Sequence, residues 1–216
     1  MHSMANSAIL SSRPVVTPPP VSVVAGRSRR RHDAARAVTL VAQRLATEHG
    51  LDGFTMEQLA DAVGVSRRTL FNYFPTKDDA VLGELPPVEE RALETFRARG
   101  PSGRLLLDLG VLATHLIGAI SPEPEEVRTL QLVLERNPRL MVKANARFED
   151  YVAGFRREIA EREGYAADDI RPRVAVAVVV SLYESALKEF AAGSDRRPFT
   201  EIFAETVAAA RSLVHE

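Results

Sequence analysis

Apolar residues recur three and four positions apart along most of this chain, which is the spacing of one face of an α-helix. Glycines and prolines divide this pattern into segments. The segments that we expect to be helical are Asp33–His49, two short helices within 54–77, 77–85, Val88–Arg99, Arg104–Ile120, Glu125–Arg136, 137–163, Pro172–Ala192 and Phe199–Val214. The pattern therefore predicts an all-α protein.

One segment conflicts with this prediction. Residues 174–180 read Val-Ala-Val-Ala-Val-Val-Val, and β-branched residues favour strands. The segment runs directly into a helical pattern that ends at Phe190, however, and Pro172 suits the first turn of a helix. We therefore predict a helix here. Because it is apolar on most sides, we expect it to be buried.

The two short helices within 54–77 have clear boundary signals. Thr55 and Gln58 have the spacing of a capping box, and Gly64 suits the left-handed residue that ends a helix. Ser66 is a suitable cap for the second helix. Leu70 and Phe74 fall on the inner side of this second helix. The opposite side carries guanidinium, amide and hydroxyl groups, which can read the edges of bases in the major groove of DNA.

The sequence Gly64-Val65-Ser66, followed by Tyr73-Phe74-Pro75-Thr76-Lys77, resembles the DNA-binding domain of the TetR family of transcriptional regulators. The resemblance runs from about Arg29 to Leu82. It implies a three-helix head with a helix-turn-helix, followed by a larger C-terminal helical domain. It also implies contacts with a double-stranded DNA operator, made in the recognition helix by Ser66, Arg67, Arg68, Thr69, Phe71 and Asn72, and on the phosphate backbone by Thr55, Tyr73 and Lys77.

Phe71 departs from the family pattern, because many relatives have tyrosine at this position. A phenyl ring cannot donate a hydrogen bond to a phosphate. We therefore expect any contact from Phe71 to be apolar, for example to a thymine methyl group.

The distribution of charge also points to nucleic acid. The whole chain has a formal net charge of −1. Residues 27–77 contain nine basic and five acidic residues, whereas residues 78–216 contain 18 basic and 24 acidic residues. A basic head attracts phosphates, and an acidic body is repelled by them.

Three regions follow from these observations: an extension over 1–26 that we expect to be disordered, a DNA-binding domain over 27–82 and a domain over 83–216. The DNA-binding domain begins with the basic cluster Arg27, Arg29, Arg30 and Arg31. This cluster is either a solvated run of charge or an arm that neutralises phosphates or enters the minor groove.

Composition excludes several other classes. The chain has no cysteine, so disulfides, thiolate nucleophiles and cysteine-type zinc fingers are impossible. Its five histidines lack metal-ligand spacing, and no nucleophile elbow or phosphate-binding glycine loop is present. We therefore expect no enzyme, no cofactor and no metal site. No apolar stretch is long enough for a membrane span, and we expect a cytoplasmic protein.

The family resemblance further implies a small-molecule effector bound among the middle helices. The candidate lining residues are Leu112, His115, Leu116, Leu134, Met141, Phe148, Tyr151 and Phe155. Residues 134–140 and 159–164 weakly resemble members that sense acyl-CoA-like ligands, with Arg136, Arg139 or Lys143 facing an anionic head group. Hydrophobic drug-like or fatty ligands are the alternative.

The last two helices are expected to form the seam of a homodimer, as is usual in the family. The final helix places Phe199, Ile202, Phe203, Val207 and Leu213 on one side. The alternative is that these helices close the core of the monomer. The sequence thus predicts a ligand-responsive regulator, most simply a repressor that binds a palindromic operator as a dimer. A ligand-independent DNA-binding or DNA-compacting protein is the competing hypothesis.

Overall fold

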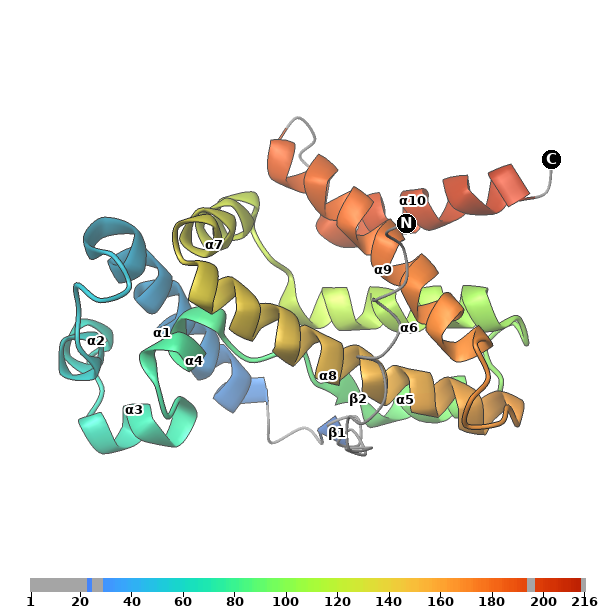
Figure 1. Ribbon diagram of the computed structural model, residues 1–216, viewed down its shortest axis with the longest axis horizontal. Coiled ribbons are helices and arrows are strands. Elements are labelled where there is room, and N and C mark those ends of the chain that lie inside the picture. Colours follow the sequence, from blue (N-terminus) through green and yellow to red (C-terminus); the bar gives the residue numbers. More distant parts are fainter. Residues whose placement is uncertain (1–22, 25–28, 194–196, 215–216) are drawn as a thin grey trace, which may run out of the picture.

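The computed structural model describes residues 23–24, 29–193 and 197–214. In this part of the chain ten helices account for nearly all regular structure (Figure 1). They are α1 (Arg29–His49), α2 (Met56–Val63), α3 (Arg67–Tyr73), α4 (Lys77–Leu82), α5 (Glu90–Arg97), α6 (Leu105–Ile120), α7 (Pro124–Arg136), α8 (Pro138–Glu163), α9 (Arg171–Ala192) and α10 (Phe199–Val214). The predicted all-α class is confirmed.

Helices α1–α4 form a head at one end of the molecule (Figure 1). The predicted caps are present. The Thr55 hydroxyl accepts a hydrogen bond from the Gln58 amide at 3.2 Å, and the Gln58 side chain accepts one from the Thr55 amide at 2.8 Å. Gly64 ends α2 with a φ of +77°, in the left-handed region that favours glycine. These caps fix the turn between α2 and α3.

The core of the head extends into the rest of the molecule. Its fully buried side chains include Leu59 and Leu70 from α2 and α3, together with Val133 from α7 and Leu140 from α8. Polar contacts reinforce the junction. Arg36 on α1 donates to both carboxylate oxygens of Glu126 on α7, at 3.0 and 2.7 Å. The head is therefore packed directly against α7 and α8.

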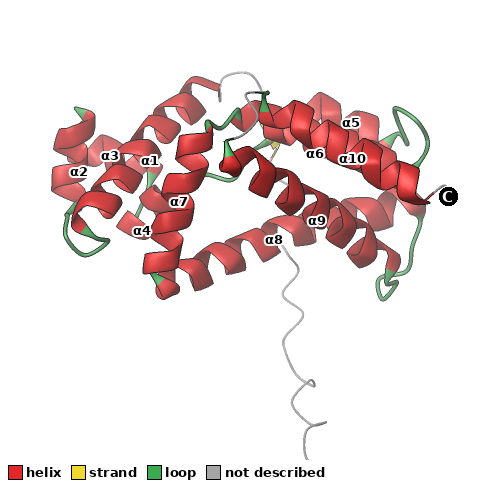
Figure 2. Cartoon of the chain, turned by 90° about the horizontal axis from the view of Figure 1, so that it is seen from above, coloured by secondary structure: helices red, strands yellow, loops and turns green. Residues whose placement is uncertain are grey.

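The remaining helices form the body, in which α9 packs against α10 (Figure 2). One core lies among α5, α6, α8 and α9. Another joins α6 and α9 to α10 and contains Phe199, Ile202 and Phe203, which are at most 4% exposed. The predicted apolar side of the final helix therefore closes the core of this chain, except for Leu213, which is 70% exposed.

Helix α9 is a helix as predicted, but it is not buried on all sides. Val174 and Val178 are 51% and 39% exposed, whereas Ala175 and Val176 are buried. Within this single chain α9 contacts α6, α7, α8 and α10, and these helices cover only part of its apolar surface. Its outward side is left as an uncovered apolar stripe within the described part of the chain.

The N-terminal region also differs from expectation. Helix α1 begins at Arg29 rather than Asp33, so the arginines at positions 29–31 lie in its first turn and not in a separate arm. Val23–Val24 (β1) pair in parallel with Val88–Glu89 (β2), within the extension that was predicted to be disordered. Residues 1–22 and 25–28 lie outside the described residues; they comprise the rest of that extension and the first two residues of the predicted DNA-binding domain, including Arg27.

Among the described residues, no single helix is long and apolar enough to cross a membrane. By length and composition alone, α6 and α7 would qualify only as a pair, and the two are bent by 92° relative to each other.

Candidate DNA interface and ligand cavity

Recognition helix α3 presents the predicted polar face to solvent. Arg67, Arg68 and Asn72 are exposed, while Leu70 and the following Phe74 are buried in the head core. Arg68 and Asn72 form no hydrogen bond or ion pair with any described residue. Their donors and acceptors are thus free to contact bases. Ser66 and Thr69 instead form the N-terminal cap of α3, because the Ser66 hydroxyl accepts a hydrogen bond from the Thr69 amide at 3.1 Å.

Arg67 is held within the head. Its guanidinium lies 3.0 Å from the carboxylate of Glu57 on α2 and 5.4 Å from the centre of the Phe71 ring. A hydrogen bond from the backbone of Glu57, together with the charge of Arg67, lowers the pKa of the Glu57 carboxyl. Phe71 is 39% exposed, which agrees with an apolar contact. A phosphate would have to compete with Glu57 for Arg67.

The residues expected to contact the phosphate backbone flank α3, and one of them also has a structural role. Thr55 is exposed, and Tyr73 is half-buried with the Arg31 guanidinium 6.0 Å from its ring centre. Lys77 is different, because its ammonium donates to the carbonyl oxygens of Leu51 and Phe54 at 2.9 and 2.8 Å. These bonds fasten α4 to the loop before α2. Lys77 therefore has a structural role, and because an ammonium has three donors, its contact with phosphate stays a prediction. The side chains of Arg29 and Arg30 lie outside the described residues.

We expect Arg68→Ala to weaken binding to the preferred operator by about 1–3 kcal/mol and to relax base preference at one position of each half-site. Tyr73→Phe should weaken binding to all sequences alike, because its hydroxyl is expected to meet phosphate. Arg136→Ala, at an exposed position in α7 far along the chain, is the matched control and should leave binding unchanged. Affinities for the operator and its single base-pair variants measure this. Equal losses on all sequences for Arg68→Ala would contradict the assignment.

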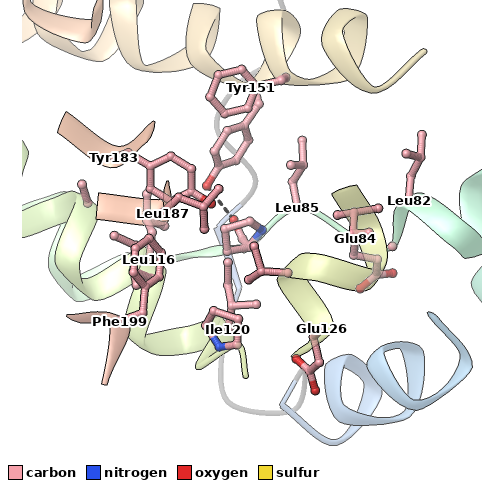
Figure 3. Close-up of a pocket in the computed structure, with 18 of the residues that line it drawn as sticks. Leu82, Glu84, Leu85, Leu116, Ile120, Glu126, Tyr151, Tyr183, Leu187 and Phe199 are labelled. Atoms are coloured by element: carbon pink, nitrogen blue, oxygen red, sulfur yellow. Dashed lines mark hydrogen bonds between the residues drawn. The ribbon is translucent and has the colours of Figure 1, made fainter. Parts of the chain in front are cut away.

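A cavity of about 460 Å³ lies where the head meets the body. Its walls come from α1, the segment 82–86 that begins at the last residue of α4, and helices α6–α9, with Phe199 at the start of α10. Figure 3 shows Tyr183, Leu187 and Phe199 on one side of it and Leu82 and Glu84 on the other. This volume is in the range of sites that bind drug-sized molecules.

Six of the eight predicted lining residues border this cavity: Leu112, Leu116, Leu134, Phe148, Tyr151 and Phe155. Two do not. His115 is exposed, because it is one residue from Leu116 and so points about 100° away around α6. Met141 follows Leu140, which belongs to the head core, and it does not border the cavity. Whether the six bind a ligand stays a prediction.

The basic residues proposed for an anionic head group do not line the cavity either. Lys143 is 2.8 Å from the Asp79 carboxylate on α4, and it holds α8 against the head. Burial raises the pKa of Asp79, but hydrogen bonds from Lys143 and Thr76 and the charge of Lys143 together outweigh this rise and lower the pKa. Arg136 and Arg139 are exposed elsewhere on α7 and α8.

Sequence reasoning missed the part of the cavity that belongs to the head. Helix α1 contributes His32, Ala35, Arg36, Thr39, Leu40 and Gln43 to the wall. These residues follow one face of α1, but they are about 80 residues away from α6 in the sequence, so no local pattern links them to the body. The chain after α4 completes the wall. There Gly83 is buried with a φ of +69°, and a Cβ at this position would lie 3.0 Å from Thr39.

Two tyrosines supply phenol groups to the cavity. The Tyr151 hydroxyl donates to the carbonyl oxygen of Pro86 at 2.8 Å (Figure 3), and burial raises its pKa, with a smaller contribution from Tyr183. Burial also raises the pKa of Tyr183, whose ring packs edge-on against Phe199. Both phenols are therefore neutral hydrogen-bonding groups near pH 7. Within the described ranges, no group of three or more His, Asp or Glu side chains has the geometry of a metal site.

Two family descriptions match this sequence. Residues 39–82 match "Bacterial regulatory proteins, tetR family", and residues 117–214 match "MftR C-terminal domain". The transcriptional regulator TcmR of Streptomyces glaucescens is 31% identical over 144 residues, which are 63% of this chain and 64% of TcmR. The match thus spans less than two thirds of that relative. The nucleoid occlusion factor SlmA of Vibrio campbellii is 26% identical over 170 residues, covering 76% of this chain and 85% of SlmA.

Two solved structures are more distant. A TetR-family regulator from Mesorhizobium loti is 21% identical, with a TM-score of 0.48, and the match covers 86% of this chain and 97% of that one. FadR of Thermus thermophilus, a TetR-family repressor solved with lauroyl-CoA, is 23% identical, with a TM-score of 0.41 and coverage of 81% and 91%.

Proposed function

Because this chain belongs to the TetR family of transcriptional regulators, with an MftR-like C-terminal domain, we propose that it is a ligand-responsive repressor. The family consists of DNA-binding regulators and not of enzymes. In our proposal a cytoplasmic homodimer binds a palindromic operator through two α3 helices, and a small molecule in the cavity releases it. The observation that carries the proposal is the composition of the cavity wall, which includes α1 of the head together with helices of the body.

The shared wall supplies a route from ligand to DNA. Helix α1 contacts α2 and α4 on the head side and α7 on the body side. A ligand that moves α1 relative to α7 must stretch the Arg36–Glu126 ion pair, which joins these two helices. Because α1 belongs to the head, its movement also repositions α3, and in a dimer it alters the distance between the two α3 helices. Half-sites on DNA have a fixed spacing of about 34–36 Å or a multiple of it, so this distance controls binding.

The test begins with selection of bound sequences from random DNA by the full chain. We expect a two-fold symmetric site, and a single asymmetric half-site would contradict the proposed dimer. Small molecules are then screened for loss of binding to the selected site. Leu116→Trp, which fills the cavity, should bind the operator but no longer respond. His115→Trp, the exposed neighbour on the same helix, should respond as the wild type does.

A ligand-independent DNA-binding protein is the second candidate, supported by the similarity to SlmA, which is described as a nucleoid occlusion factor. This candidate predicts that no small molecule releases the DNA. It also predicts that Leu116→Trp and the wild type bind the selected DNA site with the same affinity, with or without any small molecule.

A further inference from the structure

The first residue of recognition helix α3, Arg67, is held by two neighbours. Its Nη1 lies 3.0 Å from the carboxylate of Glu57, and its guanidinium carbon lies 5.4 Å from the centre of the Phe71 ring. Glu57 is in the first turn of α2, and Phe71 is four residues after Arg67 on α3. Both helices of the helix-turn-helix thus restrict one side chain. An arginine loses rotamer freedom when it binds, and Arg67 has lost part of this freedom beforehand.

The ion pair has little value for the stability of the head. Arg67 and Glu57 are 67% and 51% exposed, and ion pairs between exposed side chains contribute little to stability. The turn between α2 and α3 is fixed in other ways, by the Thr55 cap, the left-handed Gly64 and the buried core. In addition, a carboxylate on a surface that is to bind DNA repels phosphates. An acid at this position therefore needs another explanation, and its contact with Arg67 provides one.

The guanidinium of Arg67 has one edge free. Glu57 meets Nη1, and no described residue forms an ion pair or hydrogen bond with the edge formed by Nε and Nη2. A phosphate at this edge would lie beside the carboxylate of Glu57 and be repelled by it. The major-groove edge of guanine is uncharged and offers O6 and N7, which accept two N–H bonds from one arginine. Guanine therefore fits the held guanidinium better than phosphate does.

We propose that Glu57 is a positioning residue for base recognition, which orients Arg67 for a two-bond contact with one guanine in each half-site. Glu57 itself touches no base. The inference rests on the proposed function and adds a residue pair and the base that it reads. Arg68 serves a different base pair, because it points about 100° away from Arg67 around α3 and has no partner among the described residues.

The test uses the operator selected by the full chain and synthetic versions of it that are changed symmetrically in both half-sites, one base pair at a time. Dissociation constants for these sites and for unrelated DNA are measured at one salt concentration, because both depend on salt. We expect the wild type to prefer guanine at one position by about five- to 100-fold per half-site. Replacing that guanine by 7-deazaguanine, which lacks the N7 acceptor, should weaken binding by about tenfold.

Two variants separate the roles of the pair. Arg67→Lys keeps the charge but lacks the planar pair of donors. It should lose the preference for guanine at this position and the sensitivity to 7-deazaguanine, while binding unrelated DNA as the wild type does. Glu57→Gln should reduce the preference at the same base pair about two- to fivefold, the effect of an exposed ion pair. It should bind unrelated DNA more tightly, because it removes a negative charge.

Asp61→Asn is the matched control, because Asp61 is another exposed acid on α2 and has no ion-pair partner among the described residues. It removes the same charge as Glu57→Gln does. It should therefore strengthen binding to the operator and to unrelated DNA alike and leave the guanine preference unchanged. Thermal unfolding of each variant checks that it is folded.

Three results would overturn the inference. An unchanged preference at every base pair in Arg67→Lys would place Arg67 on phosphate. The same ratio of operator affinity to unrelated-DNA affinity in Glu57→Gln and Asp61→Asn would show that Glu57 acts only through its charge. A loss of preference in Glu57→Gln at a base pair that Arg67→Lys does not affect would mean that Glu57 contacts a base itself.

Failure of the proposed function is distinguishable from these results. None of the measurements involves the effector, so they do not depend on the proposed ligand response. A wild type without any sequence preference would overturn the proposed regulator and the inference with it.

Discussion

Replacing Asp108 with alanine is expected to destabilise the protein by about 3–5 kcal/mol. The Asp108 carboxylate on α6 and the Arg162 guanidinium on α8 are an ion pair in which neither side chain is exposed. Asp108 also accepts hydrogen bonds from the amide and hydroxyl of Ser102, at 2.8 and 2.6 Å. Arg162 lies 4.6 Å from the centre of the Phe96 ring. Without Asp108, the buried arginine would keep only the carboxylate of Glu163, 3.5 Å from its Nε and beyond good hydrogen-bonding distance.

The double variant Asp108→Leu with Arg162→Met is the control for this prediction. Replacing both members of a buried ion pair by apolar groups of similar size is often nearly neutral. We therefore expect the double variant to recover most of the lost stability. Urea unfolding at one fixed protein concentration measures both variants, since dimer stability depends on concentration. A loss below about 1 kcal/mol for Asp108→Ala would show that the pair is dispensable.

The Val178→Glu variant is expected to be a monomer and to bind the operator about 100-fold or more weakly, because two linked half-site contacts become independent. Val174, Ala177, Val178 and Ser181 are exposed on one side of α9, at the spacing of a helix face. In the proposed dimer this stripe is covered by the partner subunit. A glutamate there would have to lose its solvation when the subunits associate.

Val142→Glu is the matched control for the dimer prediction. Val142 on α8 is 69% exposed, against 39% for Val178, so the same substitution changes a more accessible valine outside the last two helices. Sedimentation velocity should show a monomer for Val178→Glu and a dimer for Val142→Glu. In titrations with operator DNA, only Val178→Glu should bind more weakly than the wild type. A dimeric Val178→Glu protein would exclude this stripe from the interface.

Helix positions were well predicted because glycine and proline mark them strongly. Gly64 and Gly164 end α2 and α8 with positive φ, and Pro138 begins α8 as expected. The start of α1 was predicted four residues too late, because a run of arginines carries no capping signal. The exposed side of α9 within one chain could not be predicted, because a valine-rich sequence does not reveal which of its sides has a neighbour in the folded chain.

The cavity was only partly predictable, and the reason is distance along the chain. Leu112, Leu116, Phe148, Tyr151 and Phe155 follow regular helical spacing within α6 and α8, and this spacing identified them. His32 and Glu84 are brought to the same cavity by the packing of α1 and the segment after α4 against the body. Lys77 shows the same limit on the DNA side. Its motif position suggested a phosphate contact, but it gave no sign of the hydrogen bonds from its ammonium to the carbonyl oxygens of Leu51 and Phe54.

The position of α1, which is both a wall of the cavity and part of the head, has a thermodynamic consequence. If occupancy of the cavity lowers the affinity for the operator by some factor, the operator must lower the affinity for the ligand by the same factor. Operator-bound protein then responds only at higher ligand concentrations than free protein does. In the proposed repressor, free dimers therefore bind the first ligand molecules, so the ratio of protein to operators sets the ligand concentration at which repression ends.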